Sequence, residues 1–374
     1  MTSNLSIFAA RLRDFIGICT DEPRYTAPNP DLAWQSHSDA EFNGMALVLF
    51  ALQFDHNPAY RKFCEARGST PADVHHWKQI PAAPTAAFKE LEMTCLAPDE
   101  RTTVFHSSGT TEQKPSRHFH SAESLVLYET SLWPWFKIQF PAANYQLAVL
   151  TPLSAQAPHS SLVHMFETVR KNTGAAESVF FGRVATDGSW GLDFDAVLDA
   201  LSPPAQSPTP KALALLGTAF LFVHLLDFLA EKNLRLTLPP GSRVLETGGY
   251  KNRSRSLPKA ELHTLIAERL GVPPSHIICE YGMSELSSQA YDATAKAARH
   301  FHFPPWARAQ IISPETDCEV ADGEAGLIRL FDLANVFSIL AIQTEDLAVR
   351  RGAGFELIGR TQPAEPRGCS RMTA

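Results

Sequence analysis

The chain has 374 residues, of which 44% are hydrophobic and 20% are charged, and its formal net charge is −7. This length is enough for one large domain or two moderate ones. No long block of Lys or Arg occurs, so bulk charge argues against a nucleic-acid-binding protein, and an anionic ligand must be met by locally placed cations. The six cysteines lack CxxC or His/Cys pairing, which predicts a reducing cytoplasm and no zinc site. They are Cys19, Cys64, Cys95, Cys279, Cys318 and Cys369.

The sequence shows no targeting or membrane-spanning segment. The N-terminal residues lack a basic region followed by a continuous apolar stretch, so we expect no signal peptide. The longest apolar run, residues 212–230, is interrupted by Gly217, His224 and Asp227. It predicts a buried strand and helix rather than a membrane span. We therefore expect a cytoplasmic protein.

The first hundred residues are predicted to be mainly helical. Apolar side chains recur three or four residues apart over residues 38–55 and 57–67, which is the spacing of a helix with one buried face. In the following stretch, "IPAAPTAAFKELE", Pro81 and Pro84 forbid a helix before Thr85 and permit one after it.

From about residue 145, apolar strands alternate with helical patterns. The strands are predicted at residues 145–150, 212–217, 243–249 and 276–282, with helices at 160–170, 218–233 and 258–271. Such continuous apolar strands predict a parallel sheet buried on both faces. Ligands of these sheets bind beyond the carboxyl ends of the strands. The polar, glycine-containing segments Leu216–Thr218, Glu246–Gly249 and Tyr281–Glu285 all fall there.

Beyond residue 300 the pattern is rich in strands, at residues 307–316, 325–333, 337–351 and 354–360. Gly- and Pro-containing turns separate them, which predicts an antiparallel sheet or small barrel. We therefore divide the chain into a helical segment (1–100), an α/β nucleotide-binding core (101–300) and a β-rich subdomain with a short reactive tail (301–374).

A hydroxyl-rich loop lies within "VFHSSGTTEQKPSRHFH", residues 104–120. Gly109 permits close backbone approach to a ligand, and Lys114 and Arg117 add positive charge. The loop departs from the P-loop pattern, which requires an earlier glycine. Both a phosphate-binding concavity and an ordinary exposed Ser/Thr loop remain open from this string alone. Its hydroxyls belong to Ser107, Ser108, Thr110 and Thr111.

A second motif, "YGMSE" (Tyr281–Glu285), follows an apolar strand. Its tyrosine can stack on a purine, Ser284 can reach a phosphate, and Glu285 offers an oxygen ligand to Mg²⁺. Read in isolation, a packed tyrosine before a helix with an acidic first turn is the simpler interpretation.

The two motifs occur in the order found in adenylate-forming enzymes: "SSGTT", then "YGMSE" about 170 residues later, then "TED" and "GR". Together with "LLGTAF", "ETGGYK" and "GRTQPAEPRGCS", they resemble the acyl-protein synthetase (LuxE) family, which is related to phenylacetate-CoA ligases. The resemblance covers roughly Ile80 to Ser370. It implies the adenylate-forming α/β fold, with a parallel-sheet core and a β-rich C-terminal portion.

The same resemblance implies a ligase that uses ATP and Mg²⁺ to convert a carboxylic acid, expected to be a fatty acid, into acyl-AMP. Residues Ser107–Lys114 would contact the ATP phosphates, Ser284 would touch the α-phosphate, and Glu285 would hold Mg²⁺. Asp346 would accept hydrogen bonds from the ribose, with Arg360 beside it. The adenine would be surrounded by Gly248, Gly249 and Tyr281, with Gly282 and Met283 completing the strand end.

Three departures from the superfamily pattern bear on the chemistry. Glu112 and Glu345 stand where glycines are usual. Only fourteen residues follow Arg360 in this sequence, so we expect no C-terminal cap domain of the kind whose lysine assists adenylation. We predict that Lys251 replaces that lysine, with Lys114 and Arg117 next in line. A plain surface lysine in a basic loop is the alternative for Lys251.

The tail motif "RGCS" places Cys369 beside Arg367, and nearby positive charge favours the nucleophilic thiolate. In the LuxE family a cysteine near the C-terminus carries the acyl group to a reductase partner, so we predict transfer to Cys369 and delivery to an acyl reductase or transferase. An inert terminal thiol is the alternative. Two other functions stay open: an acyl- or aryl-CoA ligase of the phenylacetate type, and a non-catalytic subunit that binds acyl-AMP.

The remaining histidines and aromatic residues are expected to have structural roles. The histidines of "VHHW" and "RHFH" lack a set of metal ligands and are interpreted as surface or packing residues. The aromatic side chains of Phe88, Trp133, Trp135 and Phe136 are interpreted as core in preference to an acyl channel.

Overall fold

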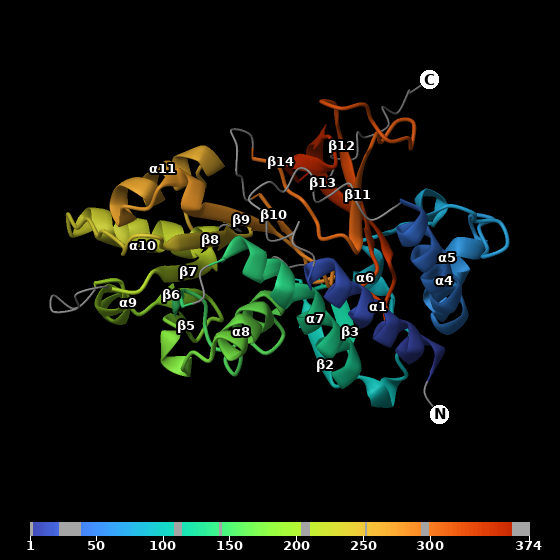
Figure 1. Ribbon diagram of the computed structural model, residues 1–374, viewed down its shortest axis with the longest axis horizontal. Coiled ribbons are helices and arrows are strands. Elements are labelled where there is room, and N and C mark those ends of the chain that lie inside the picture. The colour runs from blue at the N-terminus through green and yellow to red at the C-terminus, as the bar shows by residue number, and fades with distance from the viewer. Residues whose placement is uncertain are drawn as a thin grey trace, which may run out of the picture.

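The computed structural model describes residues 3–21, 39–107, 114–141, 144–202, 210–250, 253–292 and 299–360. Figure 1 shows two main sheets, with helices on both sides of one and the N-terminal helices beside the other. None of the described helices has the length and apolar character needed to cross a membrane.

The first sheet has the strand order β10-β9-β8-β7-β4. The four strands β4 (Gln146–Val149), β7 (Leu213–Thr218), β8 (Arg243–Thr247) and β9 (Ile277–Tyr281) are parallel, and β10 (Ala290–Tyr291) runs antiparallel to β9. The predicted parallel sheet is therefore confirmed. In its register, Thr218 pairs with Thr247 and Thr247 with Glu280, so the three predicted polar segments lie at one edge.

Both faces of this sheet are buried, because successive strand residues point to opposite sides. Leu215, Val244 and Ile277 pack with α9 (Phe194–Leu201), α10 (Ala219–Glu231) and α11 (Lys259–Leu270). Leu216, Leu245 and Ile278 belong to the second cluster, which includes α7 (Ala122–Gln139) and α8 (Ser161–Thr173). Figure 1 shows α10 and α11 on one side and α7 and α8 on the other.

The second sheet contains β11 (Ala307–Ile312), β12 (Ala325–Asp332), β13 (Ala341–Arg351) and β14 (Gly354–Arg360), all antiparallel. The predicted antiparallel sheet is thus present. Its remaining strand, β1 (Ala83–Pro84), pairs in parallel with β13 and was not predicted. Proline is tolerated at such an edge position because no ladder bond needs its missing N–H.

The N-terminal part contains α1 (Asn4–Asp21), α4 (Asp39–His56), α5 (Pro58–Glu65) and α6 (Ala87–Glu90). Helix α6 begins after the two prolines, as predicted, but has only four residues. One hydrophobic cluster includes residues from all three predicted segments, among them Phe50, Leu216 and Phe331. The proposed division at residues 100 and 300 therefore remains a prediction about chain organisation.

The described residues also contain four short 3-10 helices: η1 (Trp77–Gln79), η2 (Pro98–Glu100), η3 (Glu177–Val179) and η4 (Pro274–His276). Two hairpins accompany them. Strands β5 (Gly182–Val184) and β6 (Trp190–Leu192) form one. Strands β2 (Thr103–His106) and β3 (Arg117–His120) form the other, and they carry the hydroxyl-rich loop between them.

Candidate active site

Tyr281, at the end of β9, meets the second sheet through a buried carboxylate. Its hydroxyl donates to Asp346 Oδ2 at 2.8 Å, and Arg360 Nε donates to Asp346 Oδ1 at 3.0 Å. Asp346 and Arg360 face each other across β13 and β14. Three residues that the sequence placed at one nucleotide, 281, 346 and 360, thus form a single hydrogen-bonded cluster.

The cluster has a buried and an exposed end. Burial raises the pKa of the Tyr281 hydroxyl well above its usual range, and the Asp346 carboxylate adds to the shift, so the hydroxyl keeps its proton as a donor. The Arg360 side chain, in contrast, is 67% exposed. Tyr281 itself packs edge-on against Phe301, Phe303 and Phe355, with ring centroids 5.4–6.2 Å apart.

The base of the hydroxyl-rich loop contacts the "YGMSE" motif. Ser116 N donates to Ser107 Oγ at 2.9 Å, which closes the loop next to β3. The hydroxyls of Ser116 and Ser284 are 3.4 Å apart, and Ser284 Oγ donates to Glu285 Oε2 at 3.0 Å. Two motifs that are far apart in the sequence therefore touch through buried hydroxyls.

The two glycines after β8 leave space at the same sheet edge. Gly248 has φ of +70°, a conformation that favours glycine. A Cβ built at Gly248 or Gly249 would meet no atom within 4 Å among the described residues. Gly282 differs, because a Cβ there would lie 2.3 Å from Glu280 Oε1. The first pair leaves room beside the strand end, whereas a Cβ at Gly282 would require the Glu280 carboxyl group to shift.

The two predicted cations of the loop are engaged elsewhere. Lys114 Nζ lies 3.5 Å from Glu90 Oε2, and Arg117 NH1 lies 3.7 Å from Glu92 Oε1. Lys114 and Glu90 are 53% and 71% exposed, and such pairs contribute only about 0–1 kcal/mol. These cations face carboxylates near α6 rather than the Tyr281 cluster.

Several predicted residues lie outside the described part of the chain. These residues are Ser108, Gly109, Thr110, Thr111, Glu112, Lys251 and Cys369.

Sequence reasoning did not select Glu280, which is buried directly before Tyr281. Thr247 donates a hydrogen bond to its carboxyl group. Burial raises the pKa of Glu280 to about 7, a shift that the Thr247 bond opposes and Glu246 increases. The sequence signal available was a single acidic residue at the end of an apolar strand.

Sequence reasoning also missed Asp332, the last residue of β12, and Asn335, which follows that strand, and it did not assign a site role to His118. Asp332 Oδ2 accepts from the backbone N–H groups of Ser287 and Ser288, both at 2.9 Å. His118 and Asn335 bond the backbone of Ser284 and Glu285. These roles depend on contacts between distant segments, for which the sequence carries no local signal. The packing interpretation holds for His118 and His120, which are both buried, and Phe88, Trp135 and Phe136 lie in the core as predicted.

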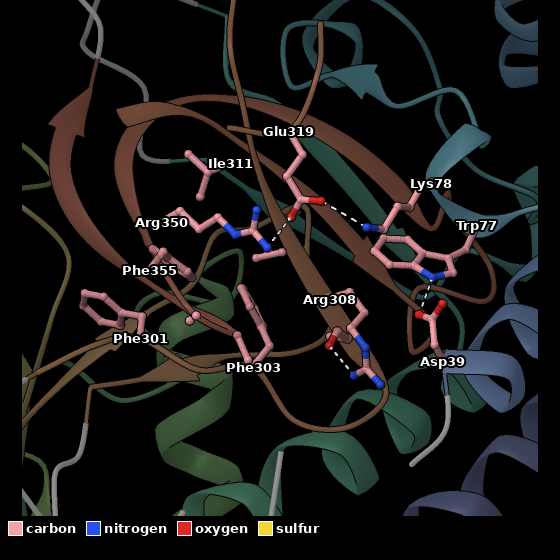
Figure 2. A pocket seen from close by; sticks show the side chains of 15 residues that line it. Asp39, Trp77, Lys78, Phe301, Phe303, Arg308, Ile311, Glu319, Arg350 and Phe355 are labelled. Atoms are coloured by element: carbon pink, nitrogen blue, oxygen red, sulfur yellow. Dashed lines mark hydrogen bonds and ion pairs between the residues drawn. The ribbon is translucent and has the colours of Figure 1, made fainter. Parts of the chain in front are cut away.

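The phenylalanines that pack against Tyr281 also line a cavity of about 270 Å³. Figure 2 shows Glu319 between Lys78 and Arg350, at distances of 3.0 and 3.8 Å. Phe301, Phe303 and Phe355 form part of its wall. The described residues predicted to contact nucleotide do not line this cavity, so it is separate from the candidate site.

Comparison with known proteins identifies the family of this chain. The family model described as "Acyl-protein synthetase, LuxE" matches residues 153–374. The chain belongs to the LuxE family. It is accordingly a ligase of the acyl-protein synthetase type, as the motif resemblance predicted.

Two relatives of this LuxE chain are named long-chain-fatty-acid–luciferin-component ligase. The protein from Vibrio harveyi is 24% identical over 336 residues, covering 86% of this chain and 84% of the relative. The one from Aliivibrio fischeri is 22% identical over 346 residues, covering 87% and 85%.

Solved structures of 2-hydroxyisobutyryl-CoA ligase share the fold of this LuxE chain. The open conformation with 2-HIB-AMP and CoA has a TM-score of 0.62 at 16% identity, covering 86% of this chain and 75% of the ligase. The thioesterification state has a TM-score of 0.64 at 16% identity, covering 87% and 69%. The predicted adenylate-forming fold is confirmed.

Proposed function

We propose that this LuxE chain activates a fatty acid with MgATP and transfers the acyl group to a thiol, its own Cys369. The names of its two relatives support a long-chain fatty acid as the substrate class. The observation that carries the proposal is the cluster of Tyr281, Asp346 and Arg360 at the edge where the loop base contacts Ser284.

In the first step, a carboxylate oxygen of the acid attacks the α-phosphorus of ATP. The new O–P bond forms as the bond to the pyrophosphate oxygen breaks, which gives acyl-AMP and pyrophosphate. Asp346 would accept hydrogen bonds from the ribose hydroxyls and the exposed Arg360 guanidinium would lie beside the sugar. Ser284 and the loop donors would contact the phosphates, because charge-assisted bonds to phosphate hold the reacting groups in line.

Mg²⁺ fits the carboxylate of Glu285. Among the described residues, no three His, Cys, Asp or Glu side chains form a metal-binding group. A site with one protein carboxylate suits Mg²⁺, which commonly binds one or two carboxylates together with substrate phosphates. The ion would neutralise charge that develops on the phosphate oxygens. Ser284 Oγ donates its one proton to Glu285 in this structure and would turn that donor to the phosphate when ATP binds, which would leave the carboxylate to the ion.

We infer that Lys251 supplies further positive charge at the α-phosphate. It lies two residues after Gly249, where a Cβ would meet no atom of the described residues within 4 Å. Lys114 and Arg117 would first have to leave Glu90 and Glu92. Lys251→Met is expected to reduce acid-dependent pyrophosphate release by tenfold or more, on the order expected for one lost charge contact. Lys232→Met, at a surface lysine paired with Glu231, is the control. Equal activity of the two variants would refute the role of Lys251.

In the second step, the Cys369 thiolate attacks the acyl carbonyl of acyl-AMP. A C–S bond forms, the C–O bond to AMP breaks, and AMP leaves. The resulting thioester retains enough group-transfer potential to pass the acyl group to a reductase or transferase partner. Arg367, close in sequence, favours the thiolate.

The test combines pyrophosphate exchange into ATP with covalent labelling. Exchange is measured with short, long and aromatic carboxylic acids, and long-chain acids should give the highest rates. ATP with a labelled fatty acid should then label the wild type and Cys318→Ser, which removes an exposed cysteine, but not Cys369→Ser. Label on Cys369→Ser would reject the acyl-cysteine, and absence of exchange with every acid would reject the adenylation.

A further inference from the structure

The segment that joins β9 to β10, residues 282–289, contains neither helix nor strand, and it is buried from Ser284 onward. The residues from Ser284 to Gln289 are each 8% exposed or less. Buried backbone N–H and C=O groups must be paired, because an unpaired one costs about as much as a lost hydrogen bond. Side chains from elsewhere in the chain must therefore hold this segment.

Two consecutive carbonyls of the segment accept from buried side chains. The carbonyl of Ser284 accepts from His118 Nδ1 at 2.8 Å, and that of Glu285 accepts from Asn335 Nδ2 at 2.9 Å. His118 and Asn335 are each 2% exposed. A carbonyl can only accept, so His118 must carry its proton on Nδ1.

The two donors come from different parts of the fold. Asn335 follows β12, and its neighbour Asp332 also holds the N–H groups of Ser287 and Ser288. His118 lies on β3, the strand that follows the hydroxyl-rich loop. Among the described residues, the hairpin that carries this loop reaches the segment through His118 and through the longer contact of Ser116.

We propose that His118 is a positioning residue that fixes the Ser284–Glu285 peptide against the β2–β3 hairpin, and so aligns the Ser284 hydroxyl and the Glu285 carboxylate with the loop. The role of these two groups toward phosphate and Mg²⁺ rests on the proposed function. Without the hydrogen bond from His118, the buried Ser284 carbonyl has lost this donor. The Ser284–Glu285 peptide then rotates toward another donor, which displaces both side chains. A displacement of about 1 Å in a reacting group can cost on the order of a hundredfold in rate.

The test compares three substitutions of His118 with one at its neighbour. His118→Asn keeps an N–H donor close to where Nδ1 stands, whereas His118→Leu removes it and His118→Gln places its amide further out. His120→Leu is the matched control: His120 is on the same strand, is equally buried, and its ring lies 4.3 Å from that of His118, but it bonds Ser124 instead.

The first readout is amide hydrogen exchange of residues 282–290, which requires no activity. We expect His118→Leu and His118→Gln to speed exchange there at least tenfold, and His118→Asn and His120→Leu to leave it near the wild-type rate. If His118→Leu does not fold, the Asn and Gln pair decides the outcome. Equal protection of the segment in the Asn and Gln variants would overturn the proposal.

The second readout separates positioning from general stability. In pyrophosphate exchange, loss of the donor should lower kcat about tenfold to a hundredfold and raise the Mg²⁺ concentration at half-maximal rate, while the KM for the acid changes little. His118→Asn should recover most of the rate. A uniform loss in His118→Asn, His118→Gln and His120→Leu would overturn the proposal. A wild type inactive with every acid would instead remove the proposed function, and hydrogen exchange alone would then decide whether His118 fixes the segment.

Discussion

Two sides of the proposed nucleotide site hold their polar groups in different ways. On the sheet side, Tyr281, Ser284 and Asp346 are buried and hydrogen-bonded before any ligand binds. On the loop side, Lys114 lies in an exposed ion pair with Glu90, and Arg117, whose side chain is 29% exposed, lies 3.7 Å from Glu92. Buried polar networks are costly to disturb, whereas exposed ion pairs contribute little. The sheet side is therefore preorganised, and the loop side can change partners when an anion arrives.

The largest effect should come from a buried carboxyl group on the sheet side. The pKa of Glu280 is raised from 4.5 to about 7 by burial, so the folded state holds its proton more tightly than the unfolded state. The stabilisation that comes from this tighter proton binding is fully present below pH 4.5 and is lost as the pH rises through 7. Glu280→Gln should therefore gain up to about 3 kcal/mol in unfolding free energy relative to the wild type between pH 4.5 and 8.

Denaturant unfolding of both proteins across this pH range measures the difference. Glu90→Gln, at an exposed carboxylate on the loop side, serves as the control and should show no comparable trend. A constant difference between Glu280→Gln and the wild type from pH 4.5 to 8 would contradict the raised pKa.

The next largest effect is expected at Asp346. Asp346→Ala removes the acceptor of both Tyr281 and Arg360 and should lower kcat/KM for ATP by about a hundredfold, since bonds to a buried charge are worth about 1.5–3 kcal/mol each. Asp317→Ala is the control, because Asp317 also pairs with an arginine but is 80% exposed. If Asp346 binds the ribose, the preference for ATP over 2′-deoxy-ATP should shrink in Asp346→Ala alone.

The smallest effect is expected on the loop side. Glu90→Gln frees Lys114 from an exposed pair and should change the unfolding free energy by less than about 1 kcal/mol. The KM for ATP should fall by no more than about threefold, because the lysine no longer has to leave a carboxylate. Titration of the exchange rate against ATP measures this change. A tenfold or larger change in the KM for ATP would mean that the loop side is as preorganised as the sheet side.

The sequence was sufficient for the architecture because hydrophobic periodicity reports burial directly. Leu215 and Leu216 point to opposite faces of a sheet covered on both sides, and the continuous apolar run around them predicted that arrangement. Strand β1 and the β2–β3 hairpin were not predicted. Strand β1 consists of two residues, Ala83 and Pro84, which is too short for a periodic pattern. The two strands of the hairpin have only four residues each, so their pattern is also weak.

The site was predictable in part, for a related physical reason. The order of motifs along the chain placed residues 281, 346 and 360 at one nucleotide, and the structure brings these three side chains together. The contact of His118 with the Ser284 carbonyl carries no such signal, because it pairs a side chain with a distant backbone group. The same holds for the ion pairs of Lys114 and Arg117, which depend on where α6 packs.

The central claim is tested most directly by the crystal structure of this protein with a non-hydrolysable acyl-adenylate mimic. We predict that its adenosine lies at the carboxyl ends of β8 and β9, with the ribose hydroxyls bonded to Asp346 and the purine beside Tyr281 and Gly248. Adenosine bound away from Tyr281 and Asp346, for example in the cavity between Lys78 and Arg350, would contradict the account.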